Sequence, residues 1–304
     1  MIYEYALEPE MVASWGSHQN YRYYIREFGL GRCRIISRYP KKWAKMVYDS
    51  FGDGNPDDKR RLVELLVRIQ ETMVKRKDSC WDCTNENWLQ NVLVEHSRHP
   101  FYAILCRRKS ENQQEIVAES DLAATPCIRW DNPHGIVVKR NAAEMAASVQ
   151  MMLTRCRWVK FIDPHISPGT ERYKASLRAF LGLLATPRPV GVPEYVEIHM
   201  GQHNATAEFL TKEFAMLIPI GLSASVFQWK EKTGGQQLHN RYILTDIGGV
   251  SFSHGLDTGD DGETDDITRL DREMYDLHCS QYDRKSTAFD EAAPMLEISG
   301  KLSM

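Results

Sequence analysis

Three side chains of the stretch 239–246 (HNRYILTD) have the types and the spacing to act on a phosphodiester. His239 and Arg241 stand two residues apart at the start of an apolar run, and Asp246 ends it. Alternate residues of a β-strand point to one side, so the first two side chains are expected to project together. An imidazole can attack phosphorus or carry a proton, and a guanidinium can hold two phosphate oxygens. The pattern indicates phosphate chemistry, although an ordinary exposed strand shows the same alternation.

Further polar side chains follow or precede this stretch at positions where a substrate could be bound. Ser253, His254 and Asp257 come after a Gly-Gly turn, and Asp163 and His165 end the apolar run WVKFI. Open α/β sheets bind ligands at the carboxyl ends of their strands, so the last two residues are expected to reach the same site. They fit an ordinary strand end and helix-entry turn equally well.

The spacing His239-x-Arg241-x4-Asp246 resembles the HxKxxxxD motif of the phospholipase D superfamily, and the likeness covers about residues 142–290. FIDPHI also resembles the strand that opens such domains. The resemblance implies that His239 is a nucleophile that forms a phosphohistidine, that Arg241 holds the phosphate, and that Asp246 is a structural carboxylate. It implies no metal and no cofactor. Because the chain has one motif, the resemblance also implies a homodimer with the site at its two-fold interface, where a second histidine comes from the partner.

The chain departs from that motif at two positions. Arg241 replaces the lysine, and the Gly-Ser-x-Asn segment expected from Ser253 onward reads SHGL, which places Leu256 at the asparagine position. Arginine and lysine are not equivalent at a phosphate site. The triplet Gly255-Leu256-Asp257 is similar to the phospholipase-D-like domain at the C-terminus of MIT-domain proteins, a group regarded as binding phospholipid headgroups without catalysis.

Two functions follow from these likenesses. The first is a metal-independent nuclease with a histidine nucleophile, since prokaryotic single-motif relatives are often nucleases of restriction or antiviral defence systems. The alternative is a catalytically inactive module that binds phosphorylated ligands or a protein partner within a larger complex.

The order of apolar segments predicts an α/β fold for the second half of the chain. After a helix at 142–156, strands at 158–166, 195–200 and 223–230 alternate with helices, which is typical of a mostly parallel sheet covered by helices. The strands 239–246 and 248–255 are expected to form an antiparallel hairpin at or near the sheet centre. The segment 258–267 is expected to be a loop before a last helix at about 271–282. We therefore expect a phospholipase-D-like mixed sheet flanked by helices.

The first 140 residues are predicted to be a mainly helical, α+β region that carries a small strand pair. Helical spacing and turn clusters predict several helices before residue 98, and the strands 100–108 and 116–120 are expected to be joined by a polar hairpin loop. Turn signals at 125–141 place the domain boundary near 140. The expected domains are therefore 1–140 and 141–304.

Composition limits the possible classes of protein. The 304-residue chain contains 42% hydrophobic and 26% charged residues, as globular proteins do. No apolar run reaches the roughly 18 residues needed to span a bilayer, and the acidic start MIYEYALEPEM lacks the parts of a signal peptide, so a cytoplasmic protein is expected. The odd number of cysteines, seven, favours reduced and mostly buried thiols over a disulfide framework.

Charge is unevenly distributed along the chain. The segment 22–77 carries 15 Lys/Arg against 7 Asp/Glu, whereas 256–299 carries 4 against 13. The basic part fits a phosphate-bearing partner such as nucleic acid, but the two segments could equally attract one another or another subunit.

Three other groups of residues allow more than one interpretation. Cys80, Cys83, His96 and His99 nearly have the spacing of a zinc site, but they also fit a capped helix start. The stretch 21–45 could stack bases and contact phosphates, or Tyr24, Ile25 and Phe28 could be core. A solvated cationic surface is expected for Arg32, Arg34, Lys41, Lys42 and Lys45. Histidines at 199 and 203 end a strand and are second-tier site candidates that could be merely solvated.

Overall fold

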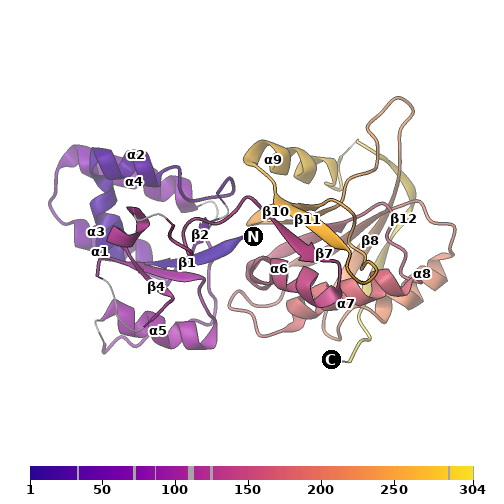
Figure 1. Cartoon of the computed structure of the whole chain (residues 1–304), viewed down its shortest axis with the longest axis horizontal. Coiled ribbons are helices and arrows are strands. Elements are labelled where there is room, and N and C mark those ends of the chain that lie inside the picture. Colours follow the sequence, from indigo (N-terminus) through magenta and orange to yellow (C-terminus); the bar gives the residue numbers. More distant parts are fainter. Residues whose placement is uncertain are drawn as a thin grey trace. The chain divides into compact units, whose positions relative to one another are not determined.

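The chain forms two compact units, each with its own sheet (Figure 1). The computed structural model describes residues 1–32, 34–70, 73–85, 87–108, 113–123, 126–286 and 288–303. The N-terminal unit comprises Ile2–Pro133 with Pro189–Gly191, and the C-terminal unit comprises His134–Arg188 and Val192–Met304 with Met1. In this described part of the chain, no helix is both long enough and apolar enough to cross a membrane.

The N-terminal unit is built on a four-stranded sheet in the order β2-β1-β3-β4, and every neighbouring pair is parallel. The strands are β1 (Tyr3–Leu7), β2 (Arg34–Ile36), β3 (Ala103–Cys106) and β4 (Ile116–Ala118). The helices are α1 (Pro9–Ala13), α2 (His18–Tyr24), α3 (Trp43–Phe51), α4 (Pro56–Gln70) and α5 (Trp88–Arg98), with short 3-10 turns η1 (Ser14–Gly16) and η2 (Glu119–Ala123).

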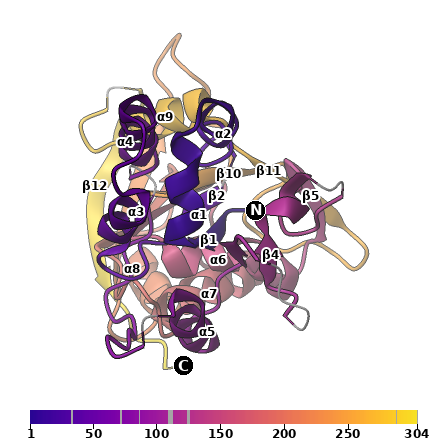
Figure 2. The same cartoon turned by 90° about the vertical axis from the view of Figure 1, so that its left-hand side faces the viewer.

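Helices cover both faces of this sheet (Figure 2). Tyr5 and Leu7 of β1 pack into the larger core with residues of α1, α3 and α4. Ala6 points the other way and packs with Trp88 and Val92 of α5. The alternation of β1 therefore fills two separate cores, one on each side of the sheet.

The sheet is larger than the small strand pair expected from the sequence. The expected hairpin at 100–120 is wrong, because β3 and β4 run parallel, with Ile104 opposite Ile116. Residues 109–112 of the expected hairpin loop lie outside the described residues. Strands of three to five residues that are buried on both faces show no polar alternation, and this explains why β1 and β2 were not predicted.

The C-terminal unit contains an eight-stranded mixed sheet in the order β12-β8-β7-β6-β9-β10-β11-β5. Only the pairs β6–β7 and β7–β8 are parallel. The strands are β5 (Gly135–Lys139), β6 (Trp158–Ile162), β7 (Tyr195–Gly201), β8 (Ser223–Lys230), β9 (Tyr242–Thr245), β10 (Gly248–Phe252), β11 (Thr264–Arg269) and β12 (Asp290–Ser299). Because β5 pairs with β11, this unit begins at His134, and the expected boundary near 140 falls just after β5.

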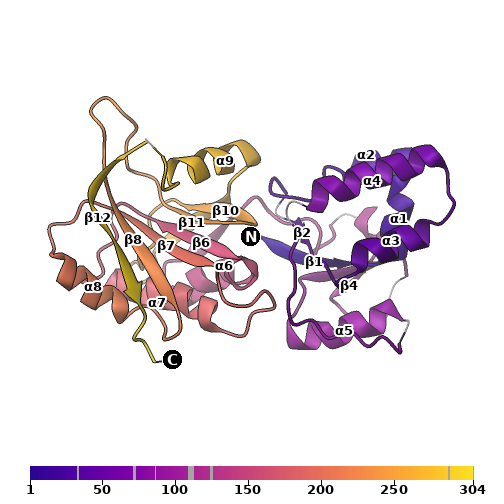
Figure 3. The ribbon, with the colours of Figure 1, turned by 180° about the vertical axis from the view of Figure 1, so that it is seen from behind.

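Helices α6 (Ala142–Arg155), α7 (Glu171–Ala185) and α8 (Ala207–Ala215) cover one face of this sheet, and α9 (Arg272–Gln281) covers the other (Figure 3). The buried residues Leu177, Phe180, Leu181 and Leu184 of α7 follow the helical spacing of three and four. Asn141 and Asp271 begin α6 and α9 by accepting hydrogen bonds from the backbone N–H three residues later.

The central hairpin of β9 and β10 is confirmed, since these strands pair antiparallel and β9 also pairs with β6. The expected loop at 258–267 is wrong in its last four residues, because β11 begins at Thr264. Strand β12 was not predicted.

Candidate functional site

The site forms where β6 ends, β9 begins and β10 ends, and Asp163 lies at its centre. Asp163 follows β6 directly and is completely buried. Its Oδ1 accepts a hydrogen bond from the His165 backbone N–H at 2.9 Å, and its Oδ2 accepts one from Leu256 N–H at 2.8 Å. The hydroxyl of Tyr173, from α7, donates to Oδ2 at 3.3 Å. We call the group Asp163, His165, Arg241 and 254–257 the Asp163 edge.

Burial controls the protonation of this carboxyl group. Loss of solvent raises the pKa of Asp163 above its ordinary value, while the N–H donors of Leu256 and His165 and the nearby Arg241 oppose the rise. The pKa of Tyr173 is also raised, first by burial and then by the charge of Asp163. The phenol therefore remains a hydrogen-bond donor to the carboxylate.

Within the triplet Gly255-Leu256-Asp257, the glycine lies against two carboxylates, those of Asp163 and Asp257. Gly255 has a φ of 148°, and a Cβ there would lie 2.8 Å from Asp257 Oδ1 and 3.1 Å from Asp163 Oδ2. Leu256 is buried, and its carbonyl accepts a hydrogen bond from Ser176 Oγ. Only glycine has both the backbone freedom and the small size that this approach requires.

Asp257 has a structural partner and is not free to bind a substrate on its own. Its Oδ1 accepts a hydrogen bond from Arg140 Nη2 at 2.7 Å, and Arg140 Nη1 donates to Glu263 at 3.0 Å. Arg140 follows β5, so this ion pair ties the loop after β10 to the edge of the sheet. This pairing favours a role for Asp257 in anchoring the loop over the expected role in binding substrate.

Arg241 is held beside Asp163 without a hydrogen bond to it. Its Nε lies 4.0 Å from Asp163 Oδ1, and only 16% of the side chain is exposed. This Nε is buried and lacks a hydrogen-bond partner within the described residues. A guanidinium has five N–H donors, so this one can still bind an anion.

His239 lies outside the strand that was expected to contain it. Strand β9 begins at Tyr242, so His239 lies in the preceding loop and is exposed, whereas Arg241 is half-buried. The expectation that His239 and Arg241 are alternate residues of a strand is therefore wrong. The prediction failed because pairing with β6 ends at Tyr242, although the Arg241 carbonyl still accepts a hydrogen bond from the Phe252 N–H of β10 at 3.0 Å.

Asp246 lies at the opposite end of β9 from Arg241. It accepts hydrogen bonds from the Arg157 backbone N–H at 2.7 Å and from Arg157 Nε at 2.9 Å, next to the start of β6. Four strand residues lie between it and Arg241, so the two positions are about 17 Å apart at the rise of a β-strand. Its interactions agree with the expected turn and structural role and place it away from the Asp163 edge.

Ser253 and His254 turn around a second buried carboxylate, Asp265 of β11. Their backbone N–H groups both donate to Asp265 Oδ1 at 3.0 Å, and His254 Nδ1 lies 3.2 Å from the same oxygen. Ser253 Oγ donates to the Asp266 carbonyl at 3.1 Å. Because 59% of the His254 side chain is exposed, Asp265 orients an imidazole whose Nε2 faces away from this contact.

The structure thus brings together Asp163, His165, Arg241 and the loop 254–257, and it separates Asp246 from them. The sequence interpretation missed Tyr173, Arg140 and Asp265. The stretch TDDITR has no alternation of apolar and polar residues, so nothing in the sequence marked Asp265 as a buried residue of a strand.

His199 is buried rather than solvated. Its Nδ1 accepts a hydrogen bond from Trp229 Nε1 at 3.0 Å, so Nε2 carries the proton and donates to Glu197 Oε2 at 3.2 Å. Glu197 also pairs with Lys160 at 3.0 Å and with Arg284 at 3.0 Å. The polar groups of His199 and Glu197 thus have partners within the described network, which supports the sheet and leaves neither residue to bind a ligand.

The zinc pattern is not brought together as a metal site. Within the described residues, no cluster of three or more His, Cys, Asp and Glu side chains could hold a metal ion. Cys80 and Cys83 are exposed, and His96 Nδ1 accepts a hydrogen bond from Phe101 N–H at 3.2 Å. Of the six described cysteines, all free, only Cys106 and Cys156 are buried, while Cys33 lies outside the described residues.

Comparison with known proteins does not assign the chain to a family. Neither a scan against protein-family models nor a search of curated proteins found a match to this chain.

Proposed function

We propose that the C-terminal unit binds phosphorylated ligands at the Asp163 edge, with Arg241 as the anion-binding group. The observation that carries the proposal is the unused guanidinium: Arg241 Nε is buried and has no hydrogen-bond partner within the described residues. The nearest carboxylate, Asp163, is 4.0 Å away and already accepts three hydrogen bonds. A phosphate could accept from the planar fork of this guanidinium through two oxygens.

The resemblance to the phospholipase D superfamily supports the same class of ligand. Arg241 occupies the lysine position of its motif, and the Gly-Leu-Asp triplet is similar to that of its headgroup-binding branch. Both likenesses concern residues at this one edge. The phospholipase-D-like fold is accordingly part of the proposal, and the mixed α/β sheet agrees with it.

A test of binding compares two arginines at opposite ends of β9. Titration calorimetry with inorganic pyrophosphate should show binding to the full chain that Arg241→Ala weakens about tenfold to hundredfold, because a charge-assisted pair is lost. Arg157→Ala is the matched control, since Arg157 is half-exposed and bound to Asp246. Equal affinity in wild type and Arg241→Ala would contradict the proposal.

Phosphodiester hydrolysis is a second candidate function, and the His254–Asp265 pair favours it. In this scheme an imidazole nitrogen of His239 attacks phosphorus, the bond to the leaving alcohol breaks, and His254 donates a proton to that alcohol. Water then attacks the phosphohistidine, the P–N bond breaks to restore the free imidazole of His239, and the proton lost by the water returns to His254. His254 would thus supply, within one chain, the second histidine that the resemblance assigns to a dimer partner.

A denaturing-gel assay in EDTA on single- and double-stranded DNA and RNA separates the two candidates. Cleavage that is lost in both His239→Ala and His254→Ala would support the hydrolase. Binding of pyrophosphate without any cleavage would leave the binding module as the function. The homodimer stays a prediction, which sedimentation of the purified chain tests.

A further inference from the structure

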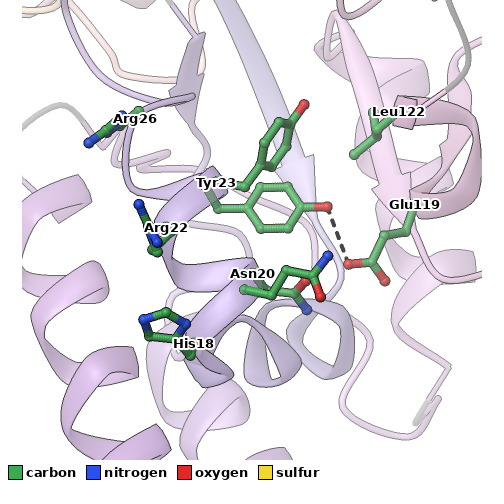
Figure 4. A pocket seen from close by; sticks show the side chains of 9 residues that line it. His18, Asn20, Arg22, Tyr23, Arg26, Glu119 and Leu122 are labelled. Carbon is green, nitrogen blue, oxygen red and sulfur yellow. Dashed lines mark hydrogen bonds between the residues drawn. The ribbon is translucent and has the colours of Figure 1, made fainter.

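The N-terminal unit contains an open pocket of about 820 Å³ at α2, and the proposed function makes no use of it (Figure 4). His18, Arg22 and Arg26 lie along one side of the pocket, and Glu119 lies on the other. His18 and Arg22 stand four residues apart and share one face of α2, and Arg26 lies on the same side of the pocket in the turn that follows the helix. The pocket therefore has a cationic side and an acidic side.

The cationic side has its charges available. His18, Arg22 and Arg26 are exposed, and none of their side chains has a hydrogen bond or ion pair with another described residue. This distinguishes them from Arg34, which was expected to be solvated but is buried, paired with Glu27 at 2.5 Å and stacked on Trp130. Two unpaired arginines on the same side of the pocket can bind a phosphate group.

A fixed aromatic ring lies between the two sides of the pocket. Tyr23 is 43% exposed, its ring packs edge-to-face on Tyr24 at 4.9 Å, and its hydroxyl accepts a hydrogen bond from Trp130 Nε1 at 3.1 Å. These contacts hold the ring while leaving much of its surface in solvent. Such a ring is a stacking surface for a planar base. Tyr24 and Phe28 are buried, as their alternative interpretation as core predicted.

The acidic side ends in a carboxylate with one oxygen to spare. Glu119 Oε1 accepts hydrogen bonds from Trp15 Nε1 at 3.1 Å and from Tyr24 Oη at 3.3 Å. No described residue donates to Oε2. The two bonds to Oε1 fix the carboxylate, so Oε2 selects a ligand group that donates hydrogen bonds and rejects one that only accepts them.

We propose that this pocket binds a guanine nucleotide unit, with the base on Tyr23 and Glu119 and the phosphate on Arg22 and Arg26. Guanine offers two adjacent N–H donors, N1–H and the 2-amino group, on its Watson–Crick edge, whereas adenine and cytosine place an acceptor next to their amino group. The negative charge of Glu119 also repels phosphate and so orients the ligand in one direction. The unit can come from a free nucleotide or from single-stranded nucleic acid.

Titration calorimetry on the full chain tests the proposal with guanosine 5′-monophosphate and with an oligothymidylate that carries one central guanine. The wild type should bind at least one of these about tenfold or more tightly than adenosine 5′-monophosphate or plain oligothymidylate, since a charge-assisted hydrogen bond is at stake. Glu119→Gln should abolish this preference. Tyr23→Ala should weaken binding about tenfold to hundredfold, and Tyr23→Phe should retain it.

The double variant Arg22→Ala/Arg26→Ala should weaken binding of the nucleotide but not of guanosine, which has no phosphate. Arg60→Ala, an exposed arginine of α4, is the matched control and should change nothing. Binding of the oligonucleotide but not the free nucleotide would identify nucleic acid as the source. The proposal is overturned if neither guanine probe binds, or if binding survives Glu119→Gln and the double arginine variant unchanged. Since no variant here touches Arg241, failure of this site is distinguishable from failure at the Asp163 edge.

Discussion

Two arginines, one in each unit, are largely shielded from solvent but differ in how they are paired. Arg76 of the N-terminal unit has no exposed side-chain surface, donates two hydrogen bonds to Glu4 at 2.9 and 2.7 Å, and donates to Glu95 at 2.8 Å. Arg241 has its nearest carboxylate at 4.0 Å. Burial lowers the pKa of Arg76, but Glu4 and Glu95 outweigh this effect and raise it.

This difference separates a structural charge from a functional one. Removing the cation from a buried, paired network leaves buried carboxylates whose charge is no longer balanced, which is expensive for folding. An arginine with unused donors contributes little to folding and keeps its donors for a ligand. Variants that remove one charge at a time should therefore differ in how much stability they lose, with the largest loss at Arg76 and the smallest at Arg241.

The largest effect is expected for Arg76→Met. It removes the buried cation that Glu4 and Glu95 share, and Glu95 retains only the partly exposed Arg98 at 3.4 Å as a cation among the described residues, so the free energy of unfolding should fall by about 3–5 kcal/mol. Urea unfolding followed by tryptophan fluorescence reports on this unit, because five of the seven tryptophans lie in it. Lys45→Ala, which removes an exposed pair with Asp49, should cost less than about 1 kcal/mol. A similar loss of unfolding free energy in Arg76→Met and Lys45→Ala would show that the buried network stabilises the unit no more than an exposed ion pair does.

The next effect concerns Glu197, a fully paired carboxylate in the unit that contains Arg241. Burial alone would raise the pKa of Glu197, but the hydrogen bond from His199 and the charge of Lys160 lower it to about 2. Because the folded pKa is below the ordinary value of 4.5, the stabilisation is complete above pH 4.5 and is lost as the pH falls through about 2. Burial lowers the pKa of His199, so the free energy of unfolding also decreases as the pH falls below 6.5.

Glu197→Gln should therefore lower the local free energy of opening of β7 by about 2–3 kcal/mol at neutral pH. Hydrogen exchange of the β7 amides measures this quantity separately from the other unit. The difference between wild type and variant should shrink as the pH is lowered from 5 toward 2. A difference that is independent of pH would show that the charge of Glu197 is not what stabilises the strand.

The fold was predictable where elements are long and alternate in kind. The segment 142–252 contains helices of nine to fifteen residues between apolar strands, and both features were predicted from local periodicity. β2 and β4 have three residues each, too few for any period. β12 contains Pro294 and a register irregularity, so its sequence resembles a loop although it pairs with β8.

The site was predictable only in part, because its geometry depends on contacts between distant segments. Asp163 and Arg241 could be identified as chemical groups after or before a strand. Tyr173 reaches Asp163 from α7, Arg140 reaches Asp257 from the end of β5, and nothing local in those segments indicates a site. The loop position of His239 follows from where pairing with β6 ends, which is a property of the sheet.

Gly255→Ala tests whether the loop beside Arg241 is held in place by close contact. The substitution adds a Cβ 2.8 Å from Asp257 Oδ1 to a backbone with a φ of 148°, and about 1–3 kcal/mol of stability should be lost. Gly262→Ala is the matched control, because Gly262 also has a positive φ, 88°, but nothing lies within 4 Å of the added atom. Thermal unfolding should show a smaller loss for the control. Equal losses would mean that backbone strain alone sets the cost.

The smallest effect on stability is expected for Arg241→Met, and it defines the other end of the comparison. Asp163 keeps its three hydrogen bonds from Leu256, His165 and Tyr173 in this variant. Loss of the nearby cation should raise the pKa of Asp163 further. A higher pKa favours the neutral carboxyl group and so reduces the buried charge that lacks a cation. Hydrogen exchange of β6 and β9 should therefore change by less than about 1 kcal/mol.

Binding should respond quite differently at the same residue. Arg241→Met should lose pyrophosphate affinity as fully as Arg241→Ala, and Arg241→Lys should recover only part of it, because an ammonium cannot hold two oxygens in one plane. The decisive comparison is therefore between the loss of pyrophosphate affinity and the loss of stability in Arg241→Met. If Arg241→Met destabilised β6 and β9 by as much as Arg76→Met destabilises its own unit, Arg241 would be a structural charge, and the unused donors would no longer argue for a ligand.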